Sequence, residues 1–349
     1  MKVLFVGLGA IGQRHLRNLR SIVGHSLEVI AYRERKLNQV ITDKLDVEQG
    51  VDIYERFKIR VFDSLSAALA QSPDAIFICN PTSMHIPVAM EAAKHGCHLF
   101  IEKAVSHNLD GIPELIKVVK DNSLTCMVGY QMRFHPCLKI LRDIVTRNAL
   151  GRILAVNVEI GEYMPAWHKY EDYRQSYAAR KDLGGGAIIS QIHEFDYVYW
   201  LFGLPKRVFS TGGHLSSLEI DVEDVASISL ECLQDGQMVP VHIHQDYLQR
   251  PPARTCKVIG DKGKVQLDFL ALTVTHFGVD GAIANHWDFT GFERNQLFMD
   301  EMRHFLACIE TGVQPCVTLR DGAQSLRMAL VAKRSLETGR VIELDESTL

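Results

Sequence analysis

Several features that would place a protein in a specialised class are missing from this sequence. No apolar run approaches the roughly 18–20 residues that cross a bilayer, and the start of the chain lacks the small-residue cleavage site of a signal peptide. No long basic run occurs and the net charge is −4, which speaks against nucleic acid or a membrane surface as a partner. The eight cysteines include no CxxC pair, so we expect reduced thiols in a cytoplasmic protein.

A glycine-rich pattern between a predicted strand and a predicted helix opens the chain. Residues 2–6 form a continuous apolar run, typical of a strand buried on both faces of a parallel sheet, and residues 27–32 read as a second strand. In this context Gly7 permits a tight turn, Gly9 lets the backbone approach a pyrophosphate and Gly12 lets helix and strand pack closely. The start of the helix offers free N–H groups to the phosphates. The residues that we expect to contact the cofactor here are Gly7, Gly9, Ala10, Ile11 and Gly12.

The end of the second strand carries no acidic residue. NAD-binding proteins usually place Asp or Glu there to accept from the ribose hydroxyls, whereas this chain has Tyr32 and Arg33, with Arg35 nearby. Arginine can pair with a 2′-phosphate and lie on the adenine ring, so the pattern favours NADP as the cofactor. Glu34 keeps NAD open as the alternative, because it could turn inward to a ribose hydroxyl.

Strands and helices alternate as far as residue 130, which predicts a doubly wound parallel sheet. Because 349 residues exceed one ordinary core, we expect a first domain over residues 1–130 and a second over residues 131–349. Ligands of such sheets lie beyond the carboxyl ends of the strands. Polar residues end three of the predicted strands, at Asn80, at Glu102–Lys103 and at Gln131. We therefore expect a bound nicotinamide beside them.

Six motifs in order carry a resemblance to a known family. They are GLGAIGQRH, CNPTSMH, EKAV, GYQMRFHP, LGGGAIISQIHEFDYVYWLFG and TGRVIEL, and they span nearly the whole chain. In combination they resemble the oxidoreductases named after glucose–fructose oxidoreductase, inositol dehydrogenase and MocA. The resemblance implies a fold of class α/β plus α+β: an N-terminal Rossmann domain and a C-terminal domain on a large, open, mostly antiparallel sheet. That sheet often forms the subunit interface, so a homo-dimer or homo-tetramer is expected.

The resemblance also implies roles for individual residues. Lys103 corresponds to the lysine of the family's Glu-Lys-Pro motif, near nicotinamide and substrate, and His193 to the usual proton acceptor or donor. The sequence departs from the family pattern at two positions: Ser190 stands where the family often has an acid, and Ala104 replaces the proline. Beyond the glycine turn, the expected cofactor-binding residues are Tyr32, Arg33, Asn80, Pro81, Thr82, His85, Glu102, Lys103 and Gln131.

A polar stretch over residues 164–186 holds too many aromatic and arginine side chains for a mere spacer. Its side chains could line a pocket for a sugar-sized or phosphorylated ligand, or they could pack the stretch against its own domain. The residues that we expect to bind substrate are Arg133, Tyr163, Trp167, Arg174, Tyr177 and His193.

One helix is predicted to carry Ser190, His193 and Asp196 on a single side, because they are spaced three apart. A neighbouring acid that orients the ring supports a catalytic role for His193. Later in the chain His242 and His244 share one face of a strand. No third ligand accompanies them, so we predict no metal site.

These observations lead to a hypothesis of reversible oxidation of a secondary alcohol on a carbohydrate. His193 would take the proton, or Lys103 would take it and pass it to His193; otherwise Lys103 stays charged and stabilises the alkoxide. Analogy with relatives found in cell-surface sugar pathways favours an amino sugar or a nucleotide sugar as substrate. The alternatives are a simple polyol dehydrogenase, an NAD-dependent glycosidase and a catalytically silent dinucleotide-binding sensor.

Overall fold

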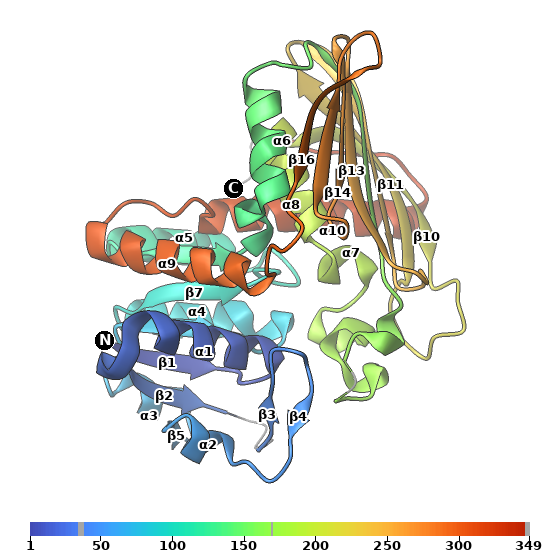
Figure 1. The fold of residues 1–349 in the computed structure, drawn as a ribbon. Helices are drawn as coiled ribbons and strands as arrows, with labels where there is room; N and C mark the ends of the chain where they lie inside the picture. The colour runs from blue at the N-terminus through green and yellow to red at the C-terminus, as the bar shows by residue number, and fades with distance from the viewer. Residues whose placement is uncertain (34–37, 169, 346–349) are drawn as a thin grey trace.

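Two β-sheets of different kinds organise the chain (Figure 1). The computed structural model describes residues 1–33, 38–168 and 170–345. The first sheet has six parallel strands, and the second has nine strands that are mostly antiparallel. The predicted fold class, a Rossmann sheet followed by a large mixed sheet, is confirmed.

In the first sheet, later strands are added on both sides of the first strand, β1 (Lys2–Val6). In spatial order its strands are β5 (Arg60–Phe62), β2 (Glu28–Tyr32), β1 (Lys2–Val6), β6 (Ala75–Ile78), β7 (His98–Glu102) and β8 (Cys126–Gly129). The central strands are apolar and buried, as expected where helices cover both faces. The strand order reverses between β1 and β6, so the crevice for a ligand lies beyond the carboxyl ends of these two strands.

Helices connect these strands, and one more helix, α6 (Pro136–Thr146), leads from β8 to the second sheet. The connecting helices are α1 (Ala10–Val23), α2 (Ile53–Arg56), α3 (Leu65–Leu69), α4 (His85–Lys94) and α5 (Ile112–Asp121). Between β2 and α2 the chain forms a small hairpin of β3 (Val40–Ile41) and β4 (Val47–Glu48). Gln13 of α1 holds this hairpin: its amide donates to the carbonyl of Gln39 at 2.8 Å and accepts from the N–H of Ile41 at 2.8 Å.

The second sheet has one parallel pair of strands near its middle, and its other neighbouring strands are antiparallel. In spatial order its strands are β16 (Ile283–Asp288), β15 (Thr273–Phe277), β14 (Gly263–Asp268), β13 (Ala253–Gly260), β9 (Ile153–Gly161), β12 (Gln237–Asp246), β11 (Val225–Gln234), β10 (Pro205–Gly213) and β17 (Ile342–Glu343). Only β9 and β12 run parallel within this order. Figure 1 shows α7 (Ala187–Ser190), α8 (His193–Phe202) and α10 (Leu319–Thr338) on the side that faces the first sheet.

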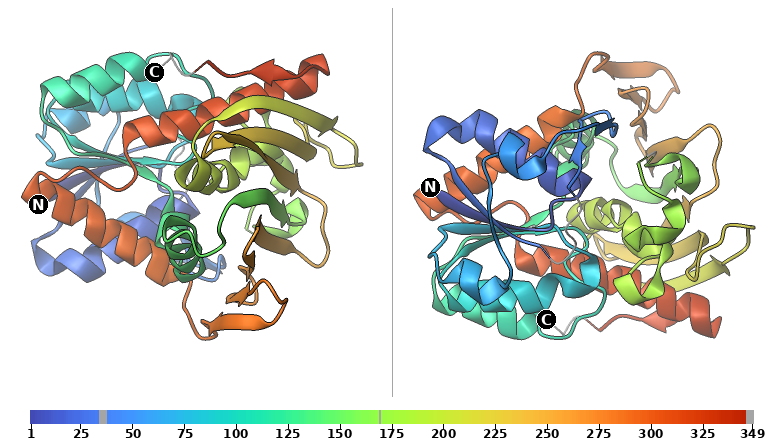
Figure 2. Two further views of the ribbon diagram at one scale, coloured as in Figure 1. Left: turned by 90° about the horizontal axis from the view of Figure 1, so that it is seen from above. Right: turned by 90° about the horizontal axis from the view of Figure 1, so that it is seen from below.

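The last part of the chain returns to the first sheet. α9 (Asn295–Thr311) lies beside α1, as the views of Figure 2 also show. The segment before α10 then pairs with the edge strand β8, where the N–H of Val128 donates to the carbonyl of Val317 at 3.2 Å. The two sheets are therefore joined at several points. Within the described residues, no helix has the length and apolar character needed to cross a membrane.

Candidate active site

The glycine turn after β1 forms the first wall of the site. Gly7 has φ +94°, and a Cβ at this position would lie 2.5 Å from the carbonyl carbon of Cys79. A Cβ at Gly12 would lie 2.2 Å from the carbonyl oxygen of Gly7. At Gly9, by contrast, a Cβ would meet no heavy atom within 4 Å, and no side chain caps the helix that starts there. Open space and free N–H groups at a helix start fit the pyrophosphate of a dinucleotide.

The segment after β6 forms the facing wall. Asn80 follows Cys79, and its side-chain Oδ1 is buried without a partner among the described residues, so an acceptor is available to a ligand. Pro81 is partly buried and Thr82 is buried. The ring nitrogens of His85 lie 2.8 Å from the carbonyl oxygens of Asn80 and Ala104. His85 therefore links this segment to the one that follows Lys103.

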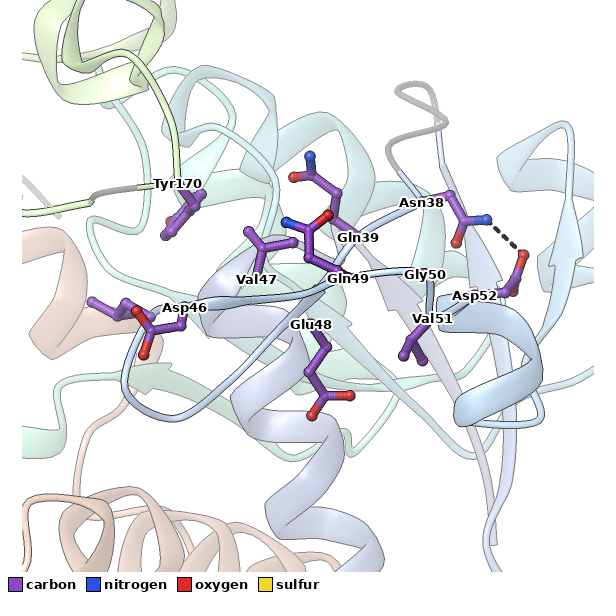
Figure 3. Close-up of a pocket in the computed structure, with 11 residues that line it drawn as sticks. Asn38, Gln39, Asp46, Val47, Glu48, Gln49, Gly50, Val51, Asp52 and Tyr170 are labelled. Atoms are coloured by element: carbon purple, nitrogen blue, oxygen red, sulfur yellow. Dashed lines mark hydrogen bonds between the residues drawn. The ribbon is translucent and has the colours of Figure 1, made fainter.

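The end of β2 carries the predicted adenosine contacts. Nη1 of Arg33 donates to the hydroxyl of Tyr54 at 3.0 Å, and the guanidinium lies 5.4 Å from the centre of that ring. Tyr32 is partly buried beside it, and Glu34 and Arg35 lie outside the described residues. A pocket of about 730 Å³ opens nearby, between the hairpin and Tyr170 (Figure 3). Its lining includes the acidic residues Asp46, Glu48 and Asp52.

The charged pair at the end of β7 is held by specific partners. Nε2 of His15, on α1, donates to Oε1 of Glu102 at 2.5 Å, and both side chains are buried. The other carboxylate oxygen of Glu102 accepts from the backbone N–H of Lys103 at 3.1 Å. Glu102 thus connects the helix that follows the glycine turn to the lysine.

The lysine reaches the second half of the chain. Nζ of Lys103 donates to the carbonyl oxygen of Ser190 at 2.7 Å and to the hydroxyl of Tyr177 at 3.4 Å. The predicted single helix over Ser190 and His193 is wrong, because it is divided into α7 and α8. Gln191 breaks it at φ −99° and ψ +37°, and the side chain of Gln245 donates to its carbonyl at 2.6 Å. The break leaves the carbonyl of Ser190 to accept from Lys103.

His193 begins α8 and is buried. The side-chain amide of Gln131 donates to Nε2 of His193 at 3.2 Å, which makes Nε2 the basic nitrogen. Burial lowers the pKa of His193 well below its ordinary value, and the charge of Lys103 lowers it further. The ring is therefore neutral at pH 7 and can accept a proton. Gln131, predicted from its place at a strand end to contact the cofactor, contacts this histidine.

Arg133 does not point to an open site. Its Nε and Nη2 donate to the two carboxylate oxygens of Asp196 at 2.9 and 2.7 Å, and both residues are buried. Nη1 donates to the carbonyl of Cys316 at 2.9 Å. These contacts use the guanidinium to join the segment after β8 to α8, so the geometry supports a structural role rather than the predicted contact with substrate.

Of the four residues predicted in the aromatic stretch, Tyr177 is the one that the structure brings to Lys103. Trp167 packs edge-on against Tyr247 with ring centres 5.0 Å apart, inside a small apolar cluster. Tyr163 lies under the guanidinium of Arg250 at 4.0 Å. Arg174 is exposed and pairs with Asp172 and Glu219. These three contacts correspond to the alternative prediction, in which the stretch packs against its own domain.

Three residues near the site were not found from the sequence. His15 had one available signal, a histidine three positions after the last glycine of the turn. Glu301 of α9 is buried with neither oxygen partnered among the described residues, and burial and the charge of Glu102 raise its pKa well above the ordinary value. Arg254 of β13 pairs with Glu194, the residue after His193, at 2.8 Å. Glu301 and Arg254 carry no local sequence signal.

Two family models match consecutive parts of the chain. The model described as "Oxidoreductase family, NAD-binding Rossmann fold" matches residues 1–130, and the GFO/IDH/MocA C-terminal domain matches residues 138–266. The chain is 27% identical to myo-inositol 2-dehydrogenase of Thermotoga maritima, over 99% of both chains.

Solved structures share the fold over the whole length. The WlbA dehydrogenase from Bordetella pertussis, in complex with NADH and UDP-GlcNAcA, has a TM-score of 0.80 at 22% identity and covers 99% of both chains. GenD2 from gentamicin A biosynthesis, in complex with NAD, has a TM-score of 0.78 at 20% identity, covering 99% of this chain and 96% of its own. The chain therefore belongs to the Gfo/Idh/MocA oxidoreductases, enzymes with an NAD-binding Rossmann fold.

Proposed function

We propose that the enzyme transfers a hydride between a nicotinamide cofactor and a secondary alcohol of a carbohydrate. The observation that carries the proposal is the contact between Lys103 and the carbonyl of Ser190 at 2.7 Å, three residues before His193. It supports a site in which a cation and a neutral imidazole lie close to the nicotinamide. Such a pair suits an alcohol that must lose a proton as its carbon loses a hydride.

His193 and Lys103 have different roles in the proposed reaction. When bound, the cofactor supplies the hydride acceptor or donor. In the oxidative direction Nε2 of His193 takes the hydroxyl proton, because burial and Lys103 keep the ring neutral. Lys103 stabilises the negative charge that develops on the substrate oxygen. The acid that the family often has near Ser190 is not needed to hold Lys103, because the backbone carbonyl of Ser190 does so.

An amino sugar or a nucleotide sugar of a cell-surface glycan pathway is the proposed substrate. The likeness to a dehydrogenase solved with UDP-GlcNAcA supports it, and so does the UDP-N-acetylglucosamine 3-dehydrogenase GnnA from Acidithiobacillus ferrooxidans, with a TM-score of 0.75. The second candidate is a simple polyol, which the similarity to myo-inositol 2-dehydrogenase favours.

The cofactor choice between NADP and NAD depends on the end of β2. Arg33 supports NADP, as a guanidinium suited to a 2′-phosphate. The acidic lining of the nearby pocket supports NAD, because carboxylates accept from ribose hydroxyls and repel a phosphate. Titration of the protein with each dinucleotide, and with an Arg33→Ala variant, decides between them. Loss of NADP binding in the variant would assign the 2′-phosphate to Arg33.

The function is tested by incubating the protein with NAD or NADP and a panel of amino sugars, nucleotide sugars and polyols. Absorbance of the reduced nicotinamide and release of free sugar are followed together. Net reduction that depends on Lys103 is the expected result. Release of sugar without net reduction would replace the proposal with a glycosidase, and dinucleotide binding without turnover on any sugar would replace it with a sensor.

We also propose a domain boundary, a cellular location and an oligomeric state for the enzyme. The domain boundary at residues 130 and 131 is supported by the end of the first sheet at Gly129 and the start of the second at Ile153. A cytoplasmic location is supported by cysteines that are all free thiols. A homo-dimer or homo-tetramer through the second sheet is supported by the exposed apolar side chains of Phe209 and Met238 on its strands. Light scattering of the purified chain tests the last point.

A further inference from the structure

Both oxygen atoms that accept from Lys103 belong to residues that pack on three consecutive glycines before α7. This glycine segment consists of residues 184–186. Ser190 is the last residue of α7, and its N–H donates to the carbonyl of Gly186 at 2.9 Å. Tyr177 begins a short turn before the glycines, and a Cβ at Gly185 would lie 2.4 Å from the carbonyl oxygen of Tyr177. The place of the glycine segment therefore determines where the amine of Lys103 finds both acceptors.

Glu223, which lies shortly before β11, holds the start of α7 with two hydrogen bonds. Its backbone carbonyl accepts from the N–H of Ala187 at 3.0 Å, and its Oε1 accepts from the N–H of Ile188 at 3.2 Å. The carboxylate is buried, and a Cβ at Gly186 would lie 2.2 Å from Oε1. Because the carboxylate occupies the space that a side chain at Gly186 would need, it lies directly against the glycine segment.

Lys333 of α10 forms an ion pair with this buried carboxylate. Its Nζ lies 3.3 Å from Oε2 of Glu223, and it donates to the carbonyl of Gly185 at 3.4 Å. Burial raises the pKa of Glu223, and the charge of Lys333 acts in the opposite direction, which favours the ionised carboxylate. Lys333 therefore contacts the glycine segment directly and also holds the carboxylate that binds the start of α7.

We propose that Glu223 and Lys333 are positioning residues for hydride transfer, because they fix the glycine segment and, through it, both partners of Lys103. The route is short: Oε1 of Glu223 holds the N–H of Ile188, two residues before Ser190, and the carbonyl of Ser190 accepts from Lys103 at 2.7 Å. The effect on the reaction rate rests on the proposed function, whereas the effect on the place of the lysine amine rests on these contacts alone.

A pair that only stabilises the fold would not affect the place of the amine, and His193 reports the difference. The charge of Lys103 opposes protonation of the imidazole, so a displaced amine raises the pKa of His193. This pKa is read by NMR titration of labelled histidine, with the signal assigned by His193→Asn. Values of kcat and KM, dinucleotide affinity and the midpoint of thermal unfolding are measured on the same proteins.

The variants change the pair in the full chain. Lys333→Met removes the charge and keeps an unbranched side chain, whereas Lys333→Arg keeps the charge. Glu223→Gln removes the negative charge and keeps an acceptor for the N–H of Ile188. The double variant of Glu223→Gln and Lys333→Met completes a double-mutant cycle.

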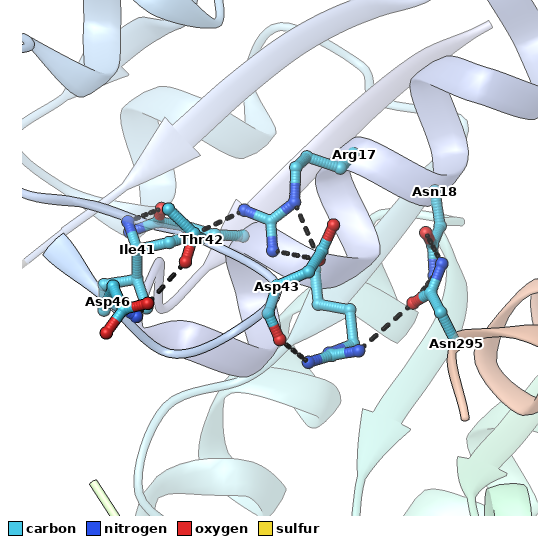
Figure 4. Close-up of polar contacts among 9 residues, drawn as sticks. Arg17, Asn18, Ile41, Thr42, Asp43, Asp46 and Asn295 are labelled. Atoms are coloured by element: carbon cyan, nitrogen blue, oxygen red, sulfur yellow. Dashed lines mark hydrogen bonds and ion pairs between the residues drawn. The ribbon is translucent and has the colours of Figure 1, made fainter. Parts of the chain in front are cut away.

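The matched control is Asn295→Ala, which breaks a different polar contact between distant parts of the chain. Asn295 of α9 exchanges hydrogen bonds with Asn18 of α1 at 2.9 and 3.3 Å (Figure 4). The contact does not involve the glycine segment. Asn295→Ala should therefore lower the midpoint of thermal unfolding while the pKa of His193 stays at its wild-type value.

We expect Lys333→Met to lower kcat about tenfold, with little change in KM or in dinucleotide affinity, because the lysine amine is displaced rather than lost. The pKa of His193 should rise in the same variant. Lys333→Arg should retain most of kcat. Glu223→Gln should act in the same direction as Lys333→Met, and the double variant should be no worse than the more severe single variant, because both changes break one ion pair.

A lower midpoint of unfolding with an unchanged pKa of His193 would give the pair a structural role only and would overturn the proposal. Additive effects in the cycle would do the same. If Lys333→Met does not fold, Glu223→Gln and Lys333→Arg carry the comparison. The NMR titration needs no turnover, so a wild-type protein that reduces nicotinamide with no sugar would refute the proposed function, while a raised pKa of His193 in the variants would still support the positioning role.

Discussion

Nε2 of His15 and Oε1 of Glu102 lie 2.5 Å apart, although 87 residues separate them in the chain. The contact joins the helix that follows the glycine turn to the strand end that carries Lys103. His15 is fully buried, with its ring 5.0 Å from that of Phe100. Glu102 therefore has a fixed orientation, and through it the backbone of Lys103 depends on the histidine.

Replacing His15 with Phe removes the donor and keeps an aromatic ring in an aromatic environment. Because Glu102 is buried and a hydrogen bond to a charged group contributes about 1.5–3 kcal/mol, we expect the free energy of unfolding to fall by about 2 kcal/mol. We also expect kcat to fall about tenfold while KM for the substrate changes little, since the lysine is misplaced rather than lost. Urea denaturation and steady-state kinetics measure the two effects.

A double-mutant cycle with Glu102→Gln separates this pairing from a general loss of packing. The two substitutions should be non-additive in kcat, because each breaks the same contact. Additive effects, or a loss of stability with unchanged kcat, would show that His15 does not position Glu102.

Lys103→Met should raise the pKa of His193. The positive charge of Lys103 opposes protonation of the imidazole, so its removal favours the charged ring, while burial, the larger effect, keeps the pKa below its ordinary value. The acid limb of the pH–rate profile of oxidation, set by the neutral fraction of His193, should move to higher pH. We expect the rate of hydride transfer to fall about a hundredfold.

The shift is measured by NMR titration of labelled histidine, with His193→Asn to assign the signal. Near-normal hydride transfer in Lys103→Met would contradict the role given to the lysine. An unchanged pKa of His193 in the variant would show that the charge of Lys103 does not act on the imidazole.

Two glycines of the turn should respond to alanine in opposite ways. At Gly9 the backbone has φ −72° and a Cβ enters open space, so Gly9→Ala should leave stability within about 0.5 kcal/mol of the wild type. The methyl group occupies the approach to the pyrophosphate, so dinucleotide affinity should fall about tenfold or more. At Gly12 a Cβ meets the carbonyl oxygen of Gly7 at 2.2 Å, and Gly12→Ala should destabilise the fold itself.

Thermal unfolding and dinucleotide titration of both variants measure this contrast. Unchanged affinity in Gly9→Ala would place the pyrophosphate elsewhere. An unchanged midpoint of unfolding in Gly12→Ala would contradict the close packing of helix and strand.

His135 should make stability depend on pH. It caps α6, where its Nδ1 accepts from the N–H of Cys137 at 3.2 Å, and burial and the charge of Arg254 lower its pKa to about 4. A histidine whose folded pKa lies below its unfolded value stabilises the protein at neutral pH and loses that stabilisation as pH falls. Between pH 7.5 and 5, one such group accounts for about 2 kcal/mol.

His135→Asn retains an acceptor for the helix start and removes the titration. Its free energy of unfolding should therefore decrease less than that of the wild type between pH 7.5 and 5, in urea denaturation at both values. His25→Asn, at an exposed position, is the control and should follow the wild type. Identical pH dependence in His135→Asn and the wild type would contradict the lowered pKa.

Much of the site could be predicted because its signals are local. The glycine turn and the polar ends of β6 and β7, with Lys103, follow from strand patterns within short windows. The role expected of His193 depends instead on the family resemblance, because the helix predicted around it is divided. The contacts of Arg133 could not be predicted. Its position after β8 suggested a ligand, but its partner Asp196 lies 63 residues away and becomes available only when α8 packs against that segment.

The sequence by itself determined the kind of fold, because turn geometry, apolar runs and motif order act between near neighbours in the chain. Only the tertiary structure decided which side chains meet: His15 with Glu102, Lys103 with the carbonyl of Ser190, and Arg133 with Asp196. The physical reason is that many charged and polar groups have several chemically equivalent partners. Burial and the packing of distant elements select one pairing.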